Sequence, residues 1–271
     1  MRHSHQFELA KRLGGDFGKL QGVRAVALGG SLVTDFSDGA SDVDLYVYAD
    51  ELPSVAMRSR LINDGRQVEL DNHFWETGDE WQDAATTIAV DVTYRSPDWV
   101  ESELDRVLKR HDAFTGYTTG VWHNVRTSLI LADSNAWLAS LKHTADQPYP
   151  DDLRQAIIAK NHPILRTVAG AYRNQIAKAL NRDDAVSVHH RVTALLESVF
   201  DIIFAVNRET HPGEKRLLAW TEAVCEARPP AFAHHVRAVL HGAAGDPDLL
   251  AAVDALADGI DALLTQQGLL D

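Results

Sequence analysis

The sequence predicts an α/β domain followed by an all-α helical bundle. Between Val23 and Arg95 the chain contains short apolar runs rich in β-branched and aromatic residues, namely VRAVALGGS, VDLYVYA, QVELDNHFW and TIAVDVTYR. Runs of this composition, bounded by Gly, Asp and Ser, are typical of β-strands. Beyond about residue 149 they give way to apolar residues at three- and four-residue spacings, which is the pattern of amphipathic helices.

Helical periodicity and chain breakers define the remaining elements. In the first half we expect helices at 4–20, 55–64 and 98–111. In the second half Pro- and Gly-containing breakers separate further helical stretches at 152–161, 163–180, 184–208, 214–226, 230–242 and 247–267. We therefore expect an α/β domain over 1–112, a connecting segment over 113–150 and a helical bundle over 151–271.

Composition limits the class of partner. The 271 residues include 26 Lys or Arg and 39 Asp or Glu, which gives a formal net charge of −13. Nucleic-acid binding depends on cationic side chains at phosphates, so this charge argues against a nucleic-acid partner, whereas an acidic surface suits a cationic one. The single Cys225 excludes an internal disulfide and a cysteine-rich metal site. No apolar run reaches the length of a membrane helix, and MRHSHQFELAKRLGG lacks a signal-peptide core, so we expect a cytoplasmic protein with no membrane partner.

A glycine-rich turn is the first candidate binding element. The first strand-like run ends in Gly29, Gly30 and Ser31. Glycines let the backbone approach a ligand closely, and successive amides in such a turn can form an anion-binding nest. The hydroxyl of Ser31 can donate to a phosphate oxygen. We therefore expect these three residues to hold phosphate groups.

Three aspartates are the second candidate element. Ten residues separate Ser31 from Asp42, and Asp44 follows two positions later on the next strand-like run, so both carboxylates point to one face. Neighbouring carboxylates disfavour each other's ionisation unless a cation lies between them, and Mg²⁺ takes carboxylates together with substrate phosphates and water. Asp91 lies in the apolar run AVDVTY, where an unpaired charge is costly to bury. We expect it to complete a site for one or two Mg²⁺ ions.

Further carboxylates surround this segment. Glu69 and Asp71 lie in QVELDNHFW, and Glu76 lies in the turn that follows. Each is a candidate for binding an amine of an acceptor or for taking the proton of an attacking hydroxyl. The sequence does not distinguish among the three.

These motifs resemble a known superfamily. The run GGS, the DVDL that follows it after ten residues and the third Asp in VDV look like the DNA polymerase β-type nucleotidyltransferases, over roughly residues 20–95. The addition of a helical C-terminal domain is similar to antibiotic nucleotidyltransferases that adenylylate aminoglycosides or lincosamides. The segments WETGDEW, VDVTYRSPDWVE and FAVNRETHPGEKRL resemble uncharacterised bacterial nucleotidyltransferase-domain proteins.

The resemblance implies a fold and a set of roles. The fold would be a mixed-sheet minimal nucleotidyltransferase domain followed by the helical bundle. Gly30 and Ser31 would hold the triphosphate of ATP, the three aspartates would bind Mg²⁺, and Lys215 in PGEKRL would reach the triphosphate from the helical domain. Antibiotic-modifying members use a carboxylate base near the acceptor hydroxyl, and no motif marks that base here, so the acceptor's identity does not carry over.

The sequence thus predicts a Mg-dependent nucleotidyltransferase. It would move a nucleoside monophosphate, AMP from ATP, to a hydroxyl of a small cationic acceptor such as an aminoglycoside-like compound. We expect the acceptor between the two domains, because clefts form at such junctions. One alternative is AMP transfer to a partner protein, which the long helical half disfavours. The other is a non-catalytic nucleotide-binding sensor, which would leave three clustered carboxylates without a reason.

Overall fold

A computed structural model describes residues 4–34, 41–62 and 64–270. The chain forms two compact units. Unit 1 consists of Met1–Leu104 and Asn124–Gln147, and unit 2 consists of Asp105–His123 and Pro148–Asp271. The division falls within two helices, α3 (Pro97–Leu108) and α4 (Gly120–Thr127).

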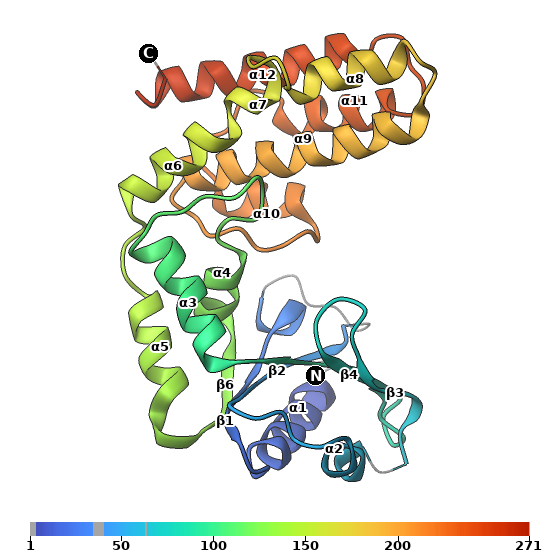
Figure 1. Cartoon of the computed structure of the whole chain (residues 1–271), viewed down its shortest axis with the longest axis vertical. Coiled ribbons are helices and arrows are strands. Elements are labelled where there is room, and N and C mark those ends of the chain that lie inside the picture. Colours follow the sequence, from blue (N-terminus) through green and yellow to red (C-terminus); the bar gives the residue numbers. More distant parts are fainter. Residues whose placement is uncertain (1–3, 35–40, 63, 271) are drawn as a thin grey trace. The chain divides into compact units, whose positions relative to one another are not determined.

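In the described part of the chain, unit 1 is built on a six-stranded mixed sheet (Figure 1). In spatial order the strands are β3 (Arg66–Asn72), β4 (Gly78–Gln82), β5 (Ala89–Arg95), β2 (Val43–Ala49), β1 (Val23–Leu28) and β6 (Leu129–Asp133). Strands β2 and β5 are parallel, and the other neighbouring pairs are antiparallel. The α/β class and the mixed sheet predicted from the sequence are confirmed.

The alternation of side chains gives the sheet two different faces. On β2, Val43, Leu45 and Val47 are buried, whereas Asp44 and Tyr46 are only half-buried. The buried side chains form one core with α1 (Ser4–Phe17) and α2 (Val55–Ile62), which cover that face of the sheet. Burial of each such side chain is worth about 1.5–3 kcal/mol, so the apolar set fixes the register of the strand. We call the opposite face, which carries Asp44, the polar face.

Sequence patterns miss two strands. Strand β4 lies where no strand is expected, because its five residues GDEWQ include a single large apolar side chain, Trp81. Strand β6 lies in the segment 113–150 and is followed by η2 (Ser134–Ala136) and α5 (Trp137–Ala145).

The expected connecting segment is therefore divided between the two units. Its residues 124–147 belong to unit 1, because β6 pairs with β1 and α5 packs on both strands. Lys142 on α5 strengthens this arrangement: its Nζ donates to the carbonyls of Val125, Arg126 and Ser128 at 2.7–2.9 Å, which satisfies acceptors at the end of α4. Pairing between strands distant in sequence leaves no local signal, and so the boundaries expected at 112 and 150 differ from those of the structure.

Unit 2 is helical, as predicted. Its further helices are α6 (Asp151–Asn161), α7 (Pro163–Arg166), α8 (Tyr172–Leu180), α9 (Ala185–Val206), α10 (Leu217–Val224), α11 (Phe232–Gly242) and α12 (Leu249–Gln266). The expected stretch 163–180 is two helices, and the other stretches begin and end within three residues of their expected limits. None of the helices among the described residues has both the length and the apolarity to span a membrane.

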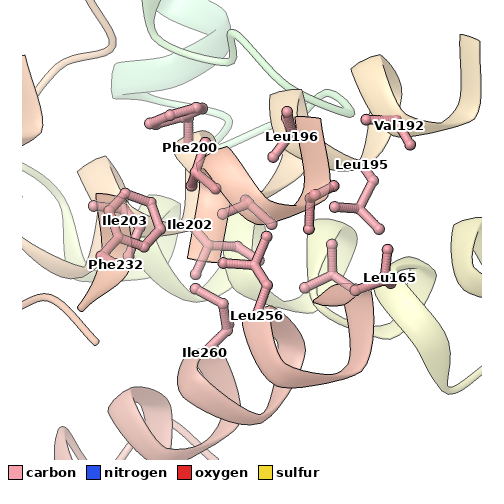
Figure 2. Packing of buried hydrophobic residues seen from close by; sticks show 14 of the residues in the cluster. Leu165, Val192, Leu195, Leu196, Phe200, Ile202, Ile203, Phe232, Leu256 and Ile260 are labelled. Carbon is pink, nitrogen blue, oxygen red and sulfur yellow. The ribbon is translucent and has the colours of Figure 1, made fainter. Parts of the chain in front are cut away.

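Helix α9 is the centre of the unit 2 core. Figure 2 shows Ile202 of α9 close to Leu256 and Ile260 of α12. Phe200 and Phe232 meet edge to face, with ring centroids 5.7 Å apart. The apolar residues of α9 are buried almost continuously over its last two turns, and its N-terminus is capped by the side chain of Asp184.

One carboxylate of α9 is buried among polar groups. Asp201 accepts hydrogen bonds from the backbone N and the Oγ1 of Thr118, at 3.1 and 2.6 Å. Asn161 of α6 lies 3.4 Å from the same carboxylate and also binds the backbone of Phe114 and Gly116. Burial raises the pKa of Asp201 to about 7. These contacts attach the segment between α3 and α4 to α6 and α9.

Candidate active site

The glycine turn follows the buried strand β1. Gly29 is extended, and the chain then makes one 3₁₀-helical turn, η1 (Gly30–Val33). Gly30 has a φ of +64°, in the left-handed region that favours glycine. The side chain of Leu32 is buried in the unit 1 core and anchors the turn there.

The same turn is attached to the beginning of β2. The backbone N of Gly29 donates to the carbonyl of Asp44 at 2.8 Å. The hydroxyl of Ser31 donates to that of Ser41 at 2.9 Å, one residue before Asp42. These contacts bring the two sequence motifs together, although ten residues separate them in the chain.

The glycines are required by the close approach of the turn to β2. A Cβ atom at Gly30 would overlap Oδ2 of Asp44, and a Cβ at Gly29 would overlap the ring of Tyr46. The backbone of the turn therefore lies directly against the Asp44 carboxylate. A phosphate bound by this backbone would lie beside that carboxylate.

The parallel pairing of β2 with β5 places Asp44 opposite Asp91. Register partners on adjacent strands lie about 4.8 Å apart and project to the same face, here the polar face. Both aspartates are half-buried. Asp42 is also half-buried and immediately precedes β2. The structure thus makes neighbours of two of the aspartates that the sequence analysis selected from separate segments.

The register continues this pair across the sheet. Asp91 is opposite Glu80 on β4, and Glu80 is opposite Glu69 on β3. We call Glu69, Glu80, Asp91 and Asp44 the carboxylate row. Like charges directly opposite each other destabilise a sheet, so four carboxylates in register favour the binding of cations along this face.

Glu80 is the member of the row that the sequence analysis missed. It lies in WETGDEW, for which no strand was predicted, and a residue outside a predicted strand has no defined face. In the structure burial alternates over Asp79, Glu80 and Trp81, of which the outer two are buried and the middle one is exposed. Because Asp79 and Glu80 are both acidic, the sequence itself carries no alternation of apolar and polar residues that would identify a strand here.

A cation and a group of aromatic rings lie next to the row on the polar face. Arg95 of β5 lies over the rings of Tyr46 and Trp99, with 4.5 and 5.6 Å between its Cζ and the two centroids. The adjacent Tyr48 is buried beneath Trp137 of α5, with 5.3 Å between their centroids. Burial raises the pKa of Tyr46, and the neighbouring arginine opposes that shift. This part of the face is therefore closed by packing.

Two of the three candidate bases are held by arginines. Glu76 binds Arg95 through both carboxylate oxygens, at 2.7 and 2.6 Å. Asp71 binds the buried Arg58 at 2.7 Å, and that hydrogen bond lowers the pKa of Asp71. Glu69, in contrast, is exposed and belongs to the carboxylate row.

Lys215 belongs to unit 2. It lies in the turn before α10 and its side chain is exposed. Its role toward a triphosphate remains a prediction from the resemblance.

The donor chemistry of the site suits Mg²⁺. Across residues 4–34, 41–62 and 64–270, no three His, Cys, Asp or Glu side chains are gathered as a ready metal site. The strands fix the pair Asp44 and Asp91, with Asp42 next to it in sequence. Mg²⁺ is usually bound by one or two carboxylates, with substrate phosphates and water completing its shell. A carboxylate pair beside a glycine turn whose backbone could bind phosphate would meet that requirement.

A separate hollow of about 630 Å³ lies elsewhere on unit 1. It is lined by residues at the beginning of β1, just after β2, around η2 and at the beginning of α5, including Arg24, Asp50 and Trp137. Gly29 and Asp44 are at the other ends of β1 and β2, so this hollow is not part of the candidate site.

One protein-family model, of a family without a described function, matches part of the chain. The family described as "Domain of unknown function (DUF4037)" matches residues 121–217. This stretch extends from α4 to the first residue of α10. No curated protein matches the chain.

Solved structures similar to this chain share little sequence with it. A nucleotidyltransferase-like protein from Exiguobacterium sibiricum has a TM-score of 0.45 and 13% identity, over 96% of this chain and 75% of that chain. The STING-associated CdnE c-di-GMP synthase from Capnocytophaga granulosa has a TM-score of 0.30 and 10% identity, over 98% and 82%. The Thermotoga maritima CCA-adding enzyme, solved with tRNA, has a TM-score of 0.34 and 11% identity, over 98% and 82%.

Proposed function

We propose that this protein transfers a nucleoside monophosphate, AMP from ATP, to a hydroxyl group of a small cationic molecule, with Mg²⁺ as cofactor. The observation that carries the proposal is the register pairing of Asp44 with Asp91, together with the close approach of the Gly30 backbone to the Asp44 carboxylate. A turn that can bind phosphate and a carboxylate pair, one member of which lies against that turn, are the elements that phosphoryl-type transfer requires.

Each residue of the site has a role in this reaction. The backbone of Gly30 and the hydroxyl of Ser31 orient the triphosphate. Asp44 and Asp91, with Asp42, hold the metal. When bound, Mg²⁺ supplies positive charge that offsets the charge developing on the transferred phosphate and the leaving pyrophosphate.

The carboxylate row supports a cationic acceptor. Beyond Asp91 the row continues with Glu80 and Glu69, both of them exposed. An ammonium group of a small molecule bound at Glu69 would offset part of the repulsion along this row. The net charge of −13 would also attract such molecules from solution. An aminoglycoside-like compound has the amino and hydroxyl groups that this surface suits.

Transfer is tested by incubation of the full chain with ATP, Mg²⁺ and a panel of amino-hydroxyl compounds, with mass spectrometry and pyrophosphate release as readouts. We expect one or more compounds to gain the mass of AMP. Asp44→Asn should lower the rate by about 10²–10³-fold, the range for loss of one electrostatic contact to a transition state. The matched control is Glu51→Gln, an exposed carboxylate outside the site, which should keep the wild-type rate.

Two outcomes would contradict the proposal. The first is ATP binding, measured by calorimetry, that is independent of Mg²⁺ and unchanged in Asp44→Asn, together with no transfer to any compound. This would support a nucleotide-binding sensor. The second is the mass of AMP on a co-purified protein and on none of the small molecules, which would support protein AMPylation.

A further inference from the structure

We infer that Glu80 is the general base that accepts the proton of the acceptor hydroxyl, an inference that rests on the proposed function. Glu80 and Asp91 are Cα partners on the antiparallel strands β4 and β5, so both side chains project to the polar face. Asp91 is in turn the partner of Asp44. A hydroxyl that approaches a phosphate held at Asp44 and Asp91 from the β4 side comes within reach of the Glu80 carboxylate.

Exposure and contacts keep this carboxylate accessible. The Glu80 side chain is exposed, and its Oε1 lies 3.5 Å from the neutral amide nitrogen of Asn72. Its neighbours in the sheet register are the carboxylates Asp91 and Glu69. A base has to be open to substrate and within hydrogen-bond reach of the proton that it takes.

The other candidate bases are less well placed. Both oxygens of Glu76 accept hydrogen bonds from Arg95, and Asp71 binds Arg58. A carboxylate paired with a cation is a weaker base, because the cation favours its ionised form. Glu69 lies two strand spacings from Asp91, about 9–10 Å. Of the carboxylates that border the pair, Glu80 alone adjoins it within the row.

Glu80 accepts a proton while the phosphate is transferred. A lone pair of the acceptor oxygen forms a new bond to the α-phosphorus of ATP. The bond from that phosphorus to the bridging oxygen of the β-phosphate breaks, and its electron pair leaves with pyrophosphate. The acceptor's O–H proton passes to a carboxylate oxygen of Glu80 and then to solvent.

The test compares Glu80→Gln and Glu80→Ala with the wild type. ATP, Mg²⁺ and kanamycin, neomycin, spectinomycin and glycerol serve as probes, with pyrophosphate release as the readout. We expect both variants to lower kcat by about 10²–10⁴-fold, the usual contribution of a positioned base. ATP binding in calorimetry should stay within about 2-fold of the wild type. Added formate should restore part of the rate in Glu80→Ala and none in Asp44→Asn, which a purely structural role would not produce.

Two control variants distinguish a wrong assignment of Glu80 from a wrong proposed function. Glu69→Gln should mainly raise KM, and Glu51→Gln should change neither constant. Wild-type kcat in Glu80→Gln, or loss of kcat in Glu69→Gln alone, would overturn the assignment of Glu80 and leave the proposed function intact. A wild-type chain that turns over none of the probes and binds ATP without dependence on Mg²⁺ would overturn the proposed function, and the role of Glu80 with it.

Discussion

Asp79 and Glu80 are neighbours on β4, and their carboxylates lie on opposite faces of one sheet. Asp79 is fully buried and accepts a hydrogen bond from Nη1 of Arg58 at 2.5 Å. Glu80 is exposed, and its partners in the sheet register are Asp91 and Glu69. The chain provides a cation in direct contact with Asp79, whereas the sheet register places Glu80 between two other carboxylates.

The difference separates a structural carboxylate from the one that we propose to be functional. Asp79 also accepts hydrogen bonds from the hydroxyl of Tyr94 and the backbone N of Asp71, so its lone pairs are satisfied inside the protein. On the Glu80 side the register places like charges opposite one another, an arrangement that we expect to cost stability in the absence of a ligand. Such a cost is typical of a binding site, where a cation from solution removes it.

The largest expected effect comes from breaking the structural pair. Arg58→Met leaves Asp79 buried without its cation, which should lower the free energy of unfolding by about 3–5 kcal/mol. Urea denaturation followed by circular dichroism measures this change. The double variant Arg58→Met with Asp79→Asn should recover part of the loss, because no buried charge then remains. A loss below about 1 kcal/mol in the single variant would contradict the structural role.

Asp201 of unit 2 sharpens the comparison, because it is buried with neutral donors in place of an arginine. Burial raises its pKa from the ordinary 3.8 to about 7. The folded state therefore binds this proton more tightly than the unfolded state, so the stability it contributes is present below about pH 4 and is lost as the pH rises to about 7.

The variant Asp201→Asn should remove this pH dependence. Relative to the variant, the wild type should lose on the order of a few kcal/mol of unfolding free energy between pH 4 and pH 7. Urea titrations at several pH values would measure it. Parallel curves for the two proteins over this range would show that Asp201 does not titrate in the fold.

The sequence predicts the elements whose pattern is local. The helices of unit 2 are periodic, and the segments GGS and DVD lie next to strands whose apolar residues make them recognisable. Their positions follow from side-chain alternation alone, so the shared face of Asp42 and Asp44 is an expectation that needs no structure.

The parts that could not be predicted depend on pairing across the chain. Strand β6 is recognised only through its hydrogen bonds to β1, more than a hundred residues earlier. The place of Glu80 beside Asp91 depends on the register of β4, which has too few apolar residues for its own periodicity to be detected. The arginines that bind Glu76 and Asp71 likewise come from other elements. The sequence therefore could not show which of the candidate carboxylates are paired with an arginine.

A substitution in the glycine turn tests whether the functional face depends on close backbone approach. Gly30→Ala places a Cβ against Oδ2 of Asp44 at a residue whose φ is left-handed. We expect it to lower the free energy of unfolding by about 1–3 kcal/mol and to abolish Mg²⁺-dependent ATP binding. The matched control is Gly15→Ala in α1, where a Cβ meets no atom within 4 Å and should stabilise the helix by about 0.5–1 kcal/mol. Equal stabilities and equal ATP affinities of the two variants would contradict the close approach.

The smallest expected effect has the opposite sign and tests the functional face directly. Glu80→Gln removes one of the charges that oppose each other in the carboxylate row. The metal-free variant should therefore be more stable than the metal-free wild type, by about 0.2–1 kcal/mol at low ionic strength. Thermal unfolding in EDTA would measure the gain, which should shrink in 1 M NaCl, where the Debye length is about 3 Å. Destabilisation of Glu80→Gln at both ionic strengths would instead mean that Glu80 stabilises the fold as Asp79 does. The proposed difference between these two neighbouring carboxylates would then be wrong.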